Sequence, residues 1–410
     1  MGANMSGVII VGAGHAAGQL AASLRMENYT GNIQIIGDES YPPYERPPLS
    51  KQVLSGEMDL DRIYLKPDIF YTENNVELLL GRKVNSIDCL AKCLTLDNGN
   101  KLVYDKLAIT TGTRVRKLSV PGSDLKNIFY VRSIDDTLNL QKQFTRSGKM
   151  VVVGGGYIGL EVAAAATKKG MSVTVLEMTD RVMSRVVAPE VSNFYEKLHL
   201  DNGVNIQTGV TVSGFEGKNK SVSGVVCNGN TFEATVVVVG VGVLPNIDIA
   251  EDAGLECNNG IVVDEYTQTS NSDIVSAGDC TNHPNPIYGK HIRLESVQNA
   301  VDQAKISAKT ICGVKEKYSA VPWFWSDQYD VKLQIVGLSD GYDQTIVRGN
   351  PNDRSFSVFY FKKEILVAVD AINSPKEFMT GRKMVSAFFK PDPKIIQDIH
   401  TPIKELLRNK

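Results

Sequence analysis

Residues 8–17 read Val8-Ile9-Ile10-Val11-Gly12-Ala13-Gly14-His15-Ala16-Ala17, an apolar strand that enters a glycine turn and continues as an Ala-rich helix to about Met26. In such a turn Gly12 makes the tight bend, Gly14 lets the backbone approach a pyrophosphate, and Ala17 lets helix and strand pack closely. The N-terminus of the helix then faces the phosphates. The stretch predicts a parallel α/β sheet that binds a dinucleotide.

A second strand and an acidic residue complete this pattern. Residues Ile33 to Gly37 form an apolar run that ends at Asp38 and Glu39. A carboxylate at this place accepts hydrogen bonds from a ribose, although the spacing from Gly12 is somewhat longer than the usual ~20 residues. A glycine turn alone is a weak signal, but strand, turn, helix, strand and acid in this order are specific.

The same construction recurs in the middle of the chain. The strand Met150 to Val153 runs into Gly154-Gly155-Gly156-Tyr157-Ile158-Gly159-Leu160-Glu161, and the next strand, Val173 to Leu176, ends at Glu177. A carboxylate at that end favours NADH because it repels the 2′-phosphate of NADPH, whereas the nearby Arg181 keeps NADPH as an alternative. Two dinucleotides on one chain imply that one stays bound as a flavin and exchanges a hydride with the other. The residues predicted to bind NADH are Gly154, Gly156, Tyr157, Ile158, Gly159, Glu161 and Glu177.

Size and composition narrow the class of protein. A chain of 410 residues with 42% hydrophobic and 22% charged residues is typical of a globular protein of about three domains. A net charge of -2 argues against nucleic acid as the main partner. No apolar run is long enough to span a membrane and no leader is visible, so we expect a cytoplasmic protein without membrane attachment. The Cys89-x-x-x-Cys93 spacing lacks a second pair or nearby histidines, so no metal site is predicted.

The order of the motifs predicts three domains. Residues 1–113 and 246–320 should form a discontinuous FAD-binding domain, and residues 114–245 an NADH-binding domain, each with a Rossmann-like parallel sheet. Residues 321–410 should form an α+β C-terminal domain, because the pattern changes there to alternating strands. Its expected strands are Val331 to Val336, Gln344 to Arg348, Phe356 to Phe361 and Ile365 to Ile372, and its last helix is expected near Ile395 to Leu407.

Over nearly its whole length the chain resembles the two-dinucleotide flavoprotein reductases, and within them the FAD-dependent ferredoxin reductases of the putidaredoxin reductase type. The stretches that carry the resemblance are Pro47 to Lys51, Thr110 to Gly112, Gly154 to Glu161, Val275 to Cys280, Glu295 to Val297 and Pro322 to Gln328. The resemblance implies an FAD site that the first glycine turn shares with other segments. Its residues would be Gly12, Gly14, Ala16, Ala17, Asp38, Lys51, Val84, Arg132, Asp279, Val297 and Trp325.

The resemblance also implies a charge pair beside the flavin. Lys51 and Glu161 would form it, and Glu295 would lie on the nicotinamide side, so these three are the predicted catalytic residues. A buried pair of this kind orients the nicotinamide without acting as an acid or base. For Trp325, packing in the core remains an equal alternative to a place on the flavin face or the partner surface.

The acceptor follows from a missing pair of cysteines. Disulfide reductases of this superfamily place two cysteines against the flavin, where this chain reads residues Tyr41 to Lys51 without any. A flavin accepts two electrons together and releases them singly, so the expected acceptor is a two-iron two-sulfur ferredoxin. By analogy that ferredoxin serves a haem-thiolate monooxygenase or a Rieske-type oxygenase. Lys66 and Lys305 match basic docking positions of the family, and for each of them an ordinary exposed lysine remains the alternative. A quinone reductase and a redox-sensing protein of the apoptosis-inducing-factor type remain alternatives.

Overall fold

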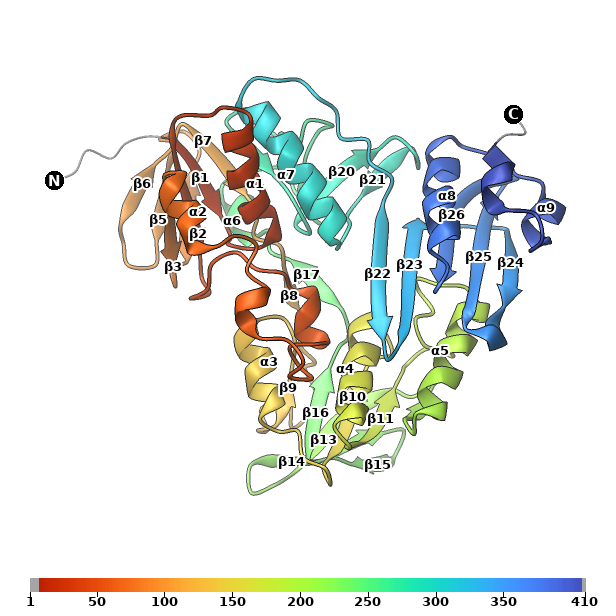
Figure 1. The fold of residues 1–410 in the computed structure, drawn as a ribbon. Coiled ribbons are helices and arrows are strands. Elements are labelled where there is room, and N and C mark those ends of the chain that lie inside the picture. The colour runs from red at the N-terminus through yellow and green to blue at the C-terminus, as the bar shows by residue number, and fades with distance from the viewer. Residues whose placement is uncertain (1–6, 408–410) are drawn as a thin grey trace. The chain divides into compact units, whose positions relative to one another are not determined.

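A computed structural model describes residues 7–407, and the chain divides into two compact units (Figure 1). Unit 1 contains the described residues through Arg46 together with Leu60–Arg114 and Val243–Pro322. Unit 2 contains Pro47–Asp59, Val115–Gly242 and the residues from Trp323 onward. The segment Pro47–Asp59 therefore groups with unit 2, although it lies within the range predicted for the FAD-binding domain.

Unit 1 is built on a five-stranded parallel sheet in the order β19-β7-β1-β2-β3. The strands are β1 (Gly7–Val11), β2 (Asn32–Gly37), β3 (Val76–Leu80), β7 (Lys106–Ile109) and β19 (Ile274–Ser276). Helices α1 (His15–Met26) and α7 (Val297–Ile311) pack side by side on one face (Figure 1). The strand and helix predicted from the first glycine turn are confirmed.

The alternation of side chains along β1 explains how both faces of this sheet are covered. Val8 and Ile10 pack in one core with the buried face of α1, whereas Ile9 and Val11 pack in another with residues of a three-stranded antiparallel sheet. Successive residues of a strand point to opposite faces, so an uninterrupted apolar strand needs a cover on each side. The antiparallel sheet consists of β4 (Val84–Asp88), β5 (Cys93–Leu96) and β6 (Lys101–Val103).

Unit 2 repeats this arrangement with a sheet in the order β12-β11-β10-β16-β9. Its strands are β9 (Ile128–Phe129), β10 (Lys149–Val153), β11 (Ser172–Leu176), β12 (Asn205–Gln207) and β16 (Val236–Val239). Helix α4 (Tyr157–Lys168) follows β10, and α5 (Pro189–Asp201) leads into β12. One face of the sheet packs against the antiparallel strands β13 (Val212–Lys218), β14 (Ser221–Cys227) and β15 (Asn230–Glu233). The predicted α/β class with two Rossmann-like sheets is confirmed.

The C-terminal part of unit 2 is an antiparallel sheet in the order β22-β23-β26-β25-β24. The strands are β22 (Trp323–Gln328), β23 (Val331–Gly337), β24 (Gln344–Asn350), β25 (Ser355–Lys362) and β26 (Ile365–Ile372). The four strands predicted from alternation are therefore confirmed, and β22 is an additional one. Helix α8 (Pro375–Ser386) packs on β23 and β26, which makes this part α+β as expected.

The prediction of one last helix near residues 395–407 is wrong. The chain forms α9 (Pro393–Gln397) and, after a break, a 3-10 helix at Ile403–Leu407. Asp398 turns the chain between them, because its carboxylate accepts hydrogen bonds from the backbone N–H of His400 and the hydroxyl of Thr401. Pro402 follows directly and has no N–H with which to continue a helix.

Short elements connect these sheets. The chain passes between the units within β8 (Thr113–Val115) and just before β17 (Val243–Pro245). The other strands are β18 (Ile261–Val262), β20 (Thr281–Asn285) and β21 (Lys290–Ile292). The other helices are α2 (Asp68–Glu73), α3 (Ile134–Gln141) and α6 (Asp248–Asp252), with 3-10 turns at Pro47–Ser50, Leu60–Arg62 and Pro351–Asp353.

Candidate functional site

The first glycine turn leaves open space in front of α1. Gly12 has a φ of +104°, and a Cβ at this position would lie 2.4 Å from the carbonyl oxygen of Thr110, so only glycine fits. Gly14 is the N-cap of α1, no side chain caps the helix, and a Cβ at Gly14 would have nothing within 4 Å. The unpaired N–H groups of the first helical turn and this open space fit a phosphate of a dinucleotide.

A segment from the far end of unit 1 closes this turn. Gly278 lies against α1, because a Cβ at Gly278 would be 3.3 Å from the Cβ of Ala16. The next residue, Asp279, opposes the lowering of the His15 pKa that burial causes. His15 Nδ1 is buried and has no hydrogen-bond partner among residues 7–407. An unpartnered buried nitrogen beside an open cradle is consistent with a ligand that supplies the missing partner.

Hydrogen bonds and one ion pair hold Asp279 and Glu295 in place. The Thr113 hydroxyl donates to Asp279 Oδ2 at 3.3 Å, and a guanidinium nitrogen of Arg293 donates to the Asp279 carbonyl at 3.3 Å. Arg293 also pairs with Glu295 at 2.8 Å, and the side chain of Glu295 is 44% exposed. Val297 is the first residue of α7. The structure thus brings Asp279 and Glu295 to one arginine that the sequence reasoning did not identify.

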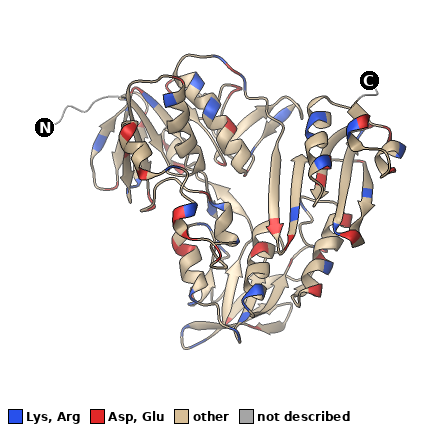
Figure 2. Ribbon diagram, viewed as in Figure 1, with Lys and Arg blue, Asp and Glu red and all other residues tan. Residues whose placement is uncertain are grey.

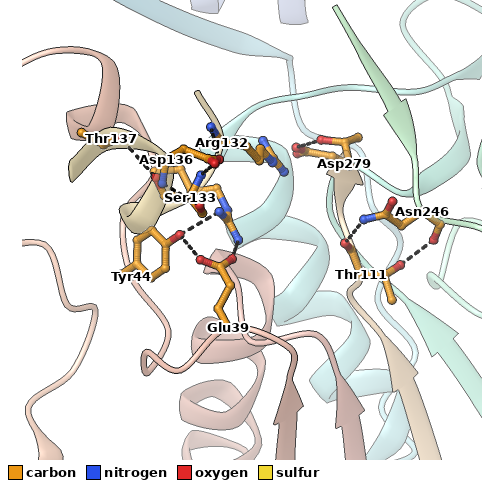
Figure 3. A network of polar contacts seen from close by, with 11 residues as sticks. Glu39, Tyr44, Thr111, Arg132, Ser133, Asp136, Thr137, Asn246 and Asp279 are labelled. Carbon is orange, nitrogen blue, oxygen red and sulfur yellow. Dashed lines mark hydrogen bonds and ion pairs between the residues drawn. The ribbon is translucent and has the colours of Figure 1, made fainter. Parts of the chain in front are cut away.

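Polar contacts also fix the strand ends beside the first turn (Figure 3). The Thr111 hydroxyl donates to the Asn246 carbonyl at 2.7 Å, and the Asn246 amide donates back to the Thr111 carbonyl at 2.9 Å. Glu39 accepts from the hydroxyl of Tyr44 and from the guanidinium of Arg46, both at 2.6 Å. The predicted Asp38 is exposed. Arg46 was missed, although it follows Tyr44 within the cysteine-free stretch already singled out.

The predicted FAD residues are divided between the units. Unit 1 contains Gly12, Gly14, Ala16, Ala17, Asp38, Asp279 and Val297, and also Val84, which is buried at the start of β4. Unit 2 contains Lys51, Arg132 and Trp325. The Arg132 backbone N–H donates to Asp136, which also forms a capping box with Ser133 at the start of α3 (Figure 3). These hydrogen bonds hold the backbone at Arg132 in place.

The second glycine turn is more tightly closed. Gly154 has a φ of +107°, and a Cβ there would lie 2.4 Å from the carbonyl oxygen of Gly240. A Cβ at Gly159 would lie 2.1 Å from the carbonyl oxygen of Gly154, so the helix approaches the turn more closely than any side chain permits. Gly156, the N-cap of α4, has nothing within 4 Å of a Cβ position. Unit 2 therefore also presents an open cradle that suits a phosphate.

Glu177 and Arg181 are both occupied within the loop after β11. Glu177 Oε2 accepts from the N–H of Gly155 at 2.6 Å, and Oε1 accepts from the N–H and hydroxyl of Thr179 at 2.8 Å. Arg181 donates to the carbonyls of Val187 and Ser184 and to the Ser192 hydroxyl, at 2.6 to 2.9 Å. The carboxylate therefore lies at the turn, whereas the guanidinium is committed to stabilising the loop.

Tyr157 and Ile158 begin α4 in different environments. The Tyr157 ring packs on Phe324 with centroids 4.9 Å apart, and its hydroxyl is buried without a hydrogen-bond partner in the described chain. Burial raises the pKa of Tyr157 well above its usual value, and the nearby Asp370 adds to this. Ile158 is 44% exposed. The predicted NADH residues thus lie together around one helix start and one loop of unit 2.

Lys51 and Glu161 form a buried ion pair in unit 2. Lys51 Nζ lies 2.9 Å from Glu161 Oε1, with side chains 9% and 3% exposed. The Ser50 hydroxyl donates to Glu161 Oε2 at 2.5 Å, and the Ser326 hydroxyl donates to Oε1 at 2.6 Å. Four groups thus satisfy each other away from water, which favours a fixed geometry. Glu295, the third predicted catalytic residue, belongs to unit 1 and pairs with Arg293 instead.

Trp325 and the two predicted docking lysines each contact a residue close to them in the sequence. Trp325 is partly buried and packs beside Trp323 with ring centroids 5.6 Å apart. Lys66 Nζ lies 5.3 Å from the centroid of the Phe70 ring. Lys305 is exposed on α7 and pairs with Asp302 at 3.2 Å; Figure 2 shows the basic residues of this helix.

Residues 7–407 contain no group of three or more His, Cys, Asp or Glu side chains that could hold a metal ion. None of the helices within these residues has an apolar stretch of the length that a membrane span requires.

Known proteins match the chain over nearly its whole length. Residues 6–304 match the pyridine nucleotide-disulphide oxidoreductase family, and residues 323–407 match the reductase C-terminal family. Putidaredoxin reductase of Pseudomonas putida is 41% identical over 406 residues, which cover 98% of this chain and 96% of that protein. The ferredoxin reductase subunit of 5,5'-dehydrodivanillate O-demethylase from a Sphingobium species is 41% identical over 97% of both chains.

Solved structures agree with these matches. The covalent complex of putidaredoxin reductase with putidaredoxin contains a chain that superposes with a TM-score of 0.96 at 40% identity, covering 98% of both chains. The resemblance inferred from the motifs is confirmed. This chain belongs to the pyridine nucleotide-disulphide oxidoreductase family.

Proposed function

We propose that the protein is an NADH-dependent ferredoxin reductase, in which FAD accepts a hydride from NADH and releases the electrons singly to a two-iron two-sulfur ferredoxin. The observation that carries this function is the pair of open glycine cradles, each at the start of a helix that follows a parallel strand. Relatives named as ferredoxin reductases support the choice of acceptor. The cysteine-free stretch 41–51 supports direct transfer without a dithiol.

The cradle of unit 1 would hold FAD. Gly12 and Gly14 leave room for its pyrophosphate, and the buried His15 nitrogen supplies one further polar contact. Asp279 presents a carboxylate that accepts hydrogen bonds from ribityl hydroxyls. The remaining residues proposed for FAD are Ala16, Ala17, Asp38, Lys51, Val84, Arg132, Val297 and Trp325.

The cradle of unit 2 would hold NADH. Gly154, Gly156 and Gly159 shape the turn, and Glu177 lies where it can accept hydrogen bonds from a ribose. Arg181 supports NADH over NADPH, because three of its five N–H donors are already bonded within the loop and these bonds hold the guanidinium in place. The other residues proposed for NADH are Tyr157, Ile158 and Glu161.

Lys51 and Glu161 would orient the reacting rings. Their burial keeps the pair in one geometry and out of water, and orientation of this kind lowers the barrier without proton transfer. Glu295 is proposed for the nicotinamide side.

The partner would dock through local basic residues. Lys66 and Lys305 of unit 1 are proposed to attract an acidic ferredoxin, which gives fast, salt-sensitive association. The oxygenase behind it would be a haem-thiolate monooxygenase or a Rieske-type enzyme, as the Sphingobium relative's name as an O-demethylase subunit suggests.

Lys51→Met tests the role of the buried pair. The substitution leaves Glu161 without its cation, so anaerobic reduction of the flavin by NADH should slow roughly ten- to a hundredfold in a stopped-flow experiment. Lys149→Met is the matched control, because Lys149 forms an ion pair with Glu233 in the same unit that is largely exposed. Equal rates in Lys51→Met and the parent protein would remove Lys51 from the mechanism.

A further inference from the structure

A chain of polar side chains leads from Glu161 into the interior of unit 2. The Ser326 hydroxyl donates to Glu161 Oε1 at 2.6 Å, and Gln328 Nε2 donates to Ser326 Oγ at 3.2 Å. Gln328 Oε1 lies 2.8 Å from His199 Nε2, and the Tyr329 hydroxyl lies 3.1 Å from His199 Nδ1. The chain therefore links α4, the strand β22 and α5.

These groups are buried in the interior of unit 2. Ser326 and His199 are 0% exposed, Gln328 is 1% exposed and Glu161 is 4% exposed. A buried polar atom that loses its partner costs about 1–3 kcal/mol, so each member depends on its neighbours. Ser326 and Gln328 are two residues apart on β22, so both side chains point to the same face of the strand.

The carboxylate sets the direction of every hydrogen bond in the chain. Ionised Glu161 can only accept, so the Ser326 hydrogen points toward it and Ser326 Oγ accepts from the Gln328 amide. That fixes Gln328 Oε1 toward His199, whose Nε2 must then carry the hydrogen. Burial, opposed by the bond to Gln328, lowers the pKa of His199 to about 4, so the ring is neutral. His199 Nδ1 is thus an acceptor, and Tyr329 donates to it.

We propose that Ser326, Gln328 and His199 are positioning residues that hold the Glu161 carboxylate in one orientation toward Lys51, so that the pair is ready for hydride transfer from the nucleotide. Ser326 fixes Oε1 while Ser50 fixes Oε2, so rotation of the carboxylate breaks at least one bond. The C-terminal sheet thereby takes part in the chemistry of the nucleotide cradle through β22. The inference rests on the proposed function in its kinetic part only.

The first test determines the direction of the hydrogen bonds between Glu161 and Tyr329 in the flavin-loaded protein. With ¹⁵N-labelled histidine, the ring nitrogen shifts at neutral pH should show His199 as the neutral tautomer protonated at Nε2. Its signals are assigned among the five histidines by comparison with His199→Gln. A ring protonated at Nδ1, or at both nitrogens, would overturn the proposal.

The second test measures the kinetic consequence. Ser326→Ala should lower the limiting rate of flavin reduction roughly tenfold or more, with little change in the NADH concentration that gives half of that rate. The control is Ser357→Ala, an equally buried serine of the same sheet whose hydroxyl has no hydrogen-bond partner in the described structure. In a Glu161→Gln background, Ser326→Ala should have a clearly smaller effect, since the two residues act as a unit.

The results separate the positioning role of Ser326 from the proposed function of the protein. Equal limiting rates in the Ser326→Ala and Ser357→Ala proteins, or full additivity with Glu161→Gln, would overturn the positioning role. A parent protein that binds FAD but is not reduced by NADH would instead contradict the proposed function. In that case the tautomer of His199 still decides whether the chain has the proposed direction.

Discussion

The two glycine turns are built from the same order of elements but are closed in different ways. In each unit a strand leads through the turn into a 12-residue helix, and an antiparallel sheet of three strands covers the other face of the parallel sheet. In unit 1 the turn is closed by Gly278 and Asp279, which belong to the last segment of that unit, Val243–Pro322. In unit 2 it is closed by Glu177, which reaches back to Gly155.

This difference corresponds to the two cofactors proposed for the cradles. A site formed by segments distant in sequence surrounds its ligand on several sides, which suits FAD as a group that stays bound. The second turn packs tightly on the backbone of Gly240 and is bonded to the loop after the next strand, but the space in front of Gly156 stays open, which suits NADH as a group that exchanges. The third position of each turn differs as well: Ala17 carries a methyl group, whereas Gly159 has no room for one.

The largest effect is expected at Gly159. In Gly159→Ala the new Cβ meets the Gly154 carbonyl, so α4 must move away from the turn, and NADH-driven flavin reduction should fall at least about a hundredfold. FAD content should change much less, because the glycine cradle proposed for the FAD pyrophosphate lies in unit 1. Stopped-flow reduction measures the first effect and absorbance of the purified protein the second.

Gly240→Ala is the control for this change. Gly240 faces the same glycine, but its Cβ would meet atoms only at 3.7 Å or beyond, which is ordinary contact. If Gly159→Ala reduced its flavin as fast as Gly240→Ala does, the tight closure of the second turn would have no functional meaning.

Smaller effects are expected from alanine at the two N-caps, and each change should weaken the binding of a different cofactor. Gly14→Ala and Gly156→Ala both place a methyl group in space that the protein leaves empty, so each folded chain tolerates it while a phosphate there does not. Gly14→Ala should lose part of its FAD during purification. Gly156→Ala should keep FAD but need roughly tenfold more NADH for half-maximal reduction. If both changes affected the same cofactor, the assignment of the cradles would be wrong.

The smallest effect on turnover is expected from Asp370, a buried carboxyl of unit 2 that accepts a hydrogen bond from Tyr360. Burial raises its pKa to about 7, opposed by this bond, from 3.8 when exposed. The folded state therefore holds the proton more tightly, and the stability that Asp370 contributes at low pH is lost as pH rises from about 4 through 7, at up to about 1.4 kcal/mol per pH unit. Asp370→Asn should remove this loss.

Tryptophan fluorescence can follow that change in unit 2, because Trp323 and Trp325 are the two tryptophans of the chain and both belong to this unit. The urea midpoint of Asp370→Asn relative to the parent should rise between pH 4 and pH 7. The low pKa of His199, about 4, acts in the opposite direction, since its stability is lost as pH falls below 6.5, but it is common to both proteins. A constant difference between the two midpoints would show that Asp370 titrates normally.

The elements that could be predicted from the sequence are those specified locally. The glycine turns, their strands and helices, and the alternating strands of the C-terminal sheet follow from the period of side chains and from turn chemistry. The break in the last helix was missed because the local effects of Asp398 and Pro402 are stronger than the helical pattern of the surrounding residues. The pairing of Lys51 with Glu161 came from family resemblance rather than from periodicity.

The partners of the site could not be predicted, because tertiary contacts create them. Ser326 and Ser50 reach Glu161 across 165 and 111 positions of the chain, and nothing in their own neighbourhoods distinguishes them from other serines. Arg46 could not be predicted for the same reason. Its hydrogen bond to Glu39 forms because the loop after β2 folds back toward the end of that strand. Such residues become visible only when the fold brings them together.

If FAD links NADH to a one-electron iron-sulfur partner, a single anaerobic titration should show both transfers. Stoichiometric NADH should bleach the visible absorbance of the purified yellow protein, and an oxidised two-iron two-sulfur ferredoxin should then restore it with two equivalents, more slowly as salt increases. This link would be ruled out by a protein that retains no FAD, by a visible band that NADH leaves unchanged, or by a reduced flavin that the ferredoxin does not reoxidise.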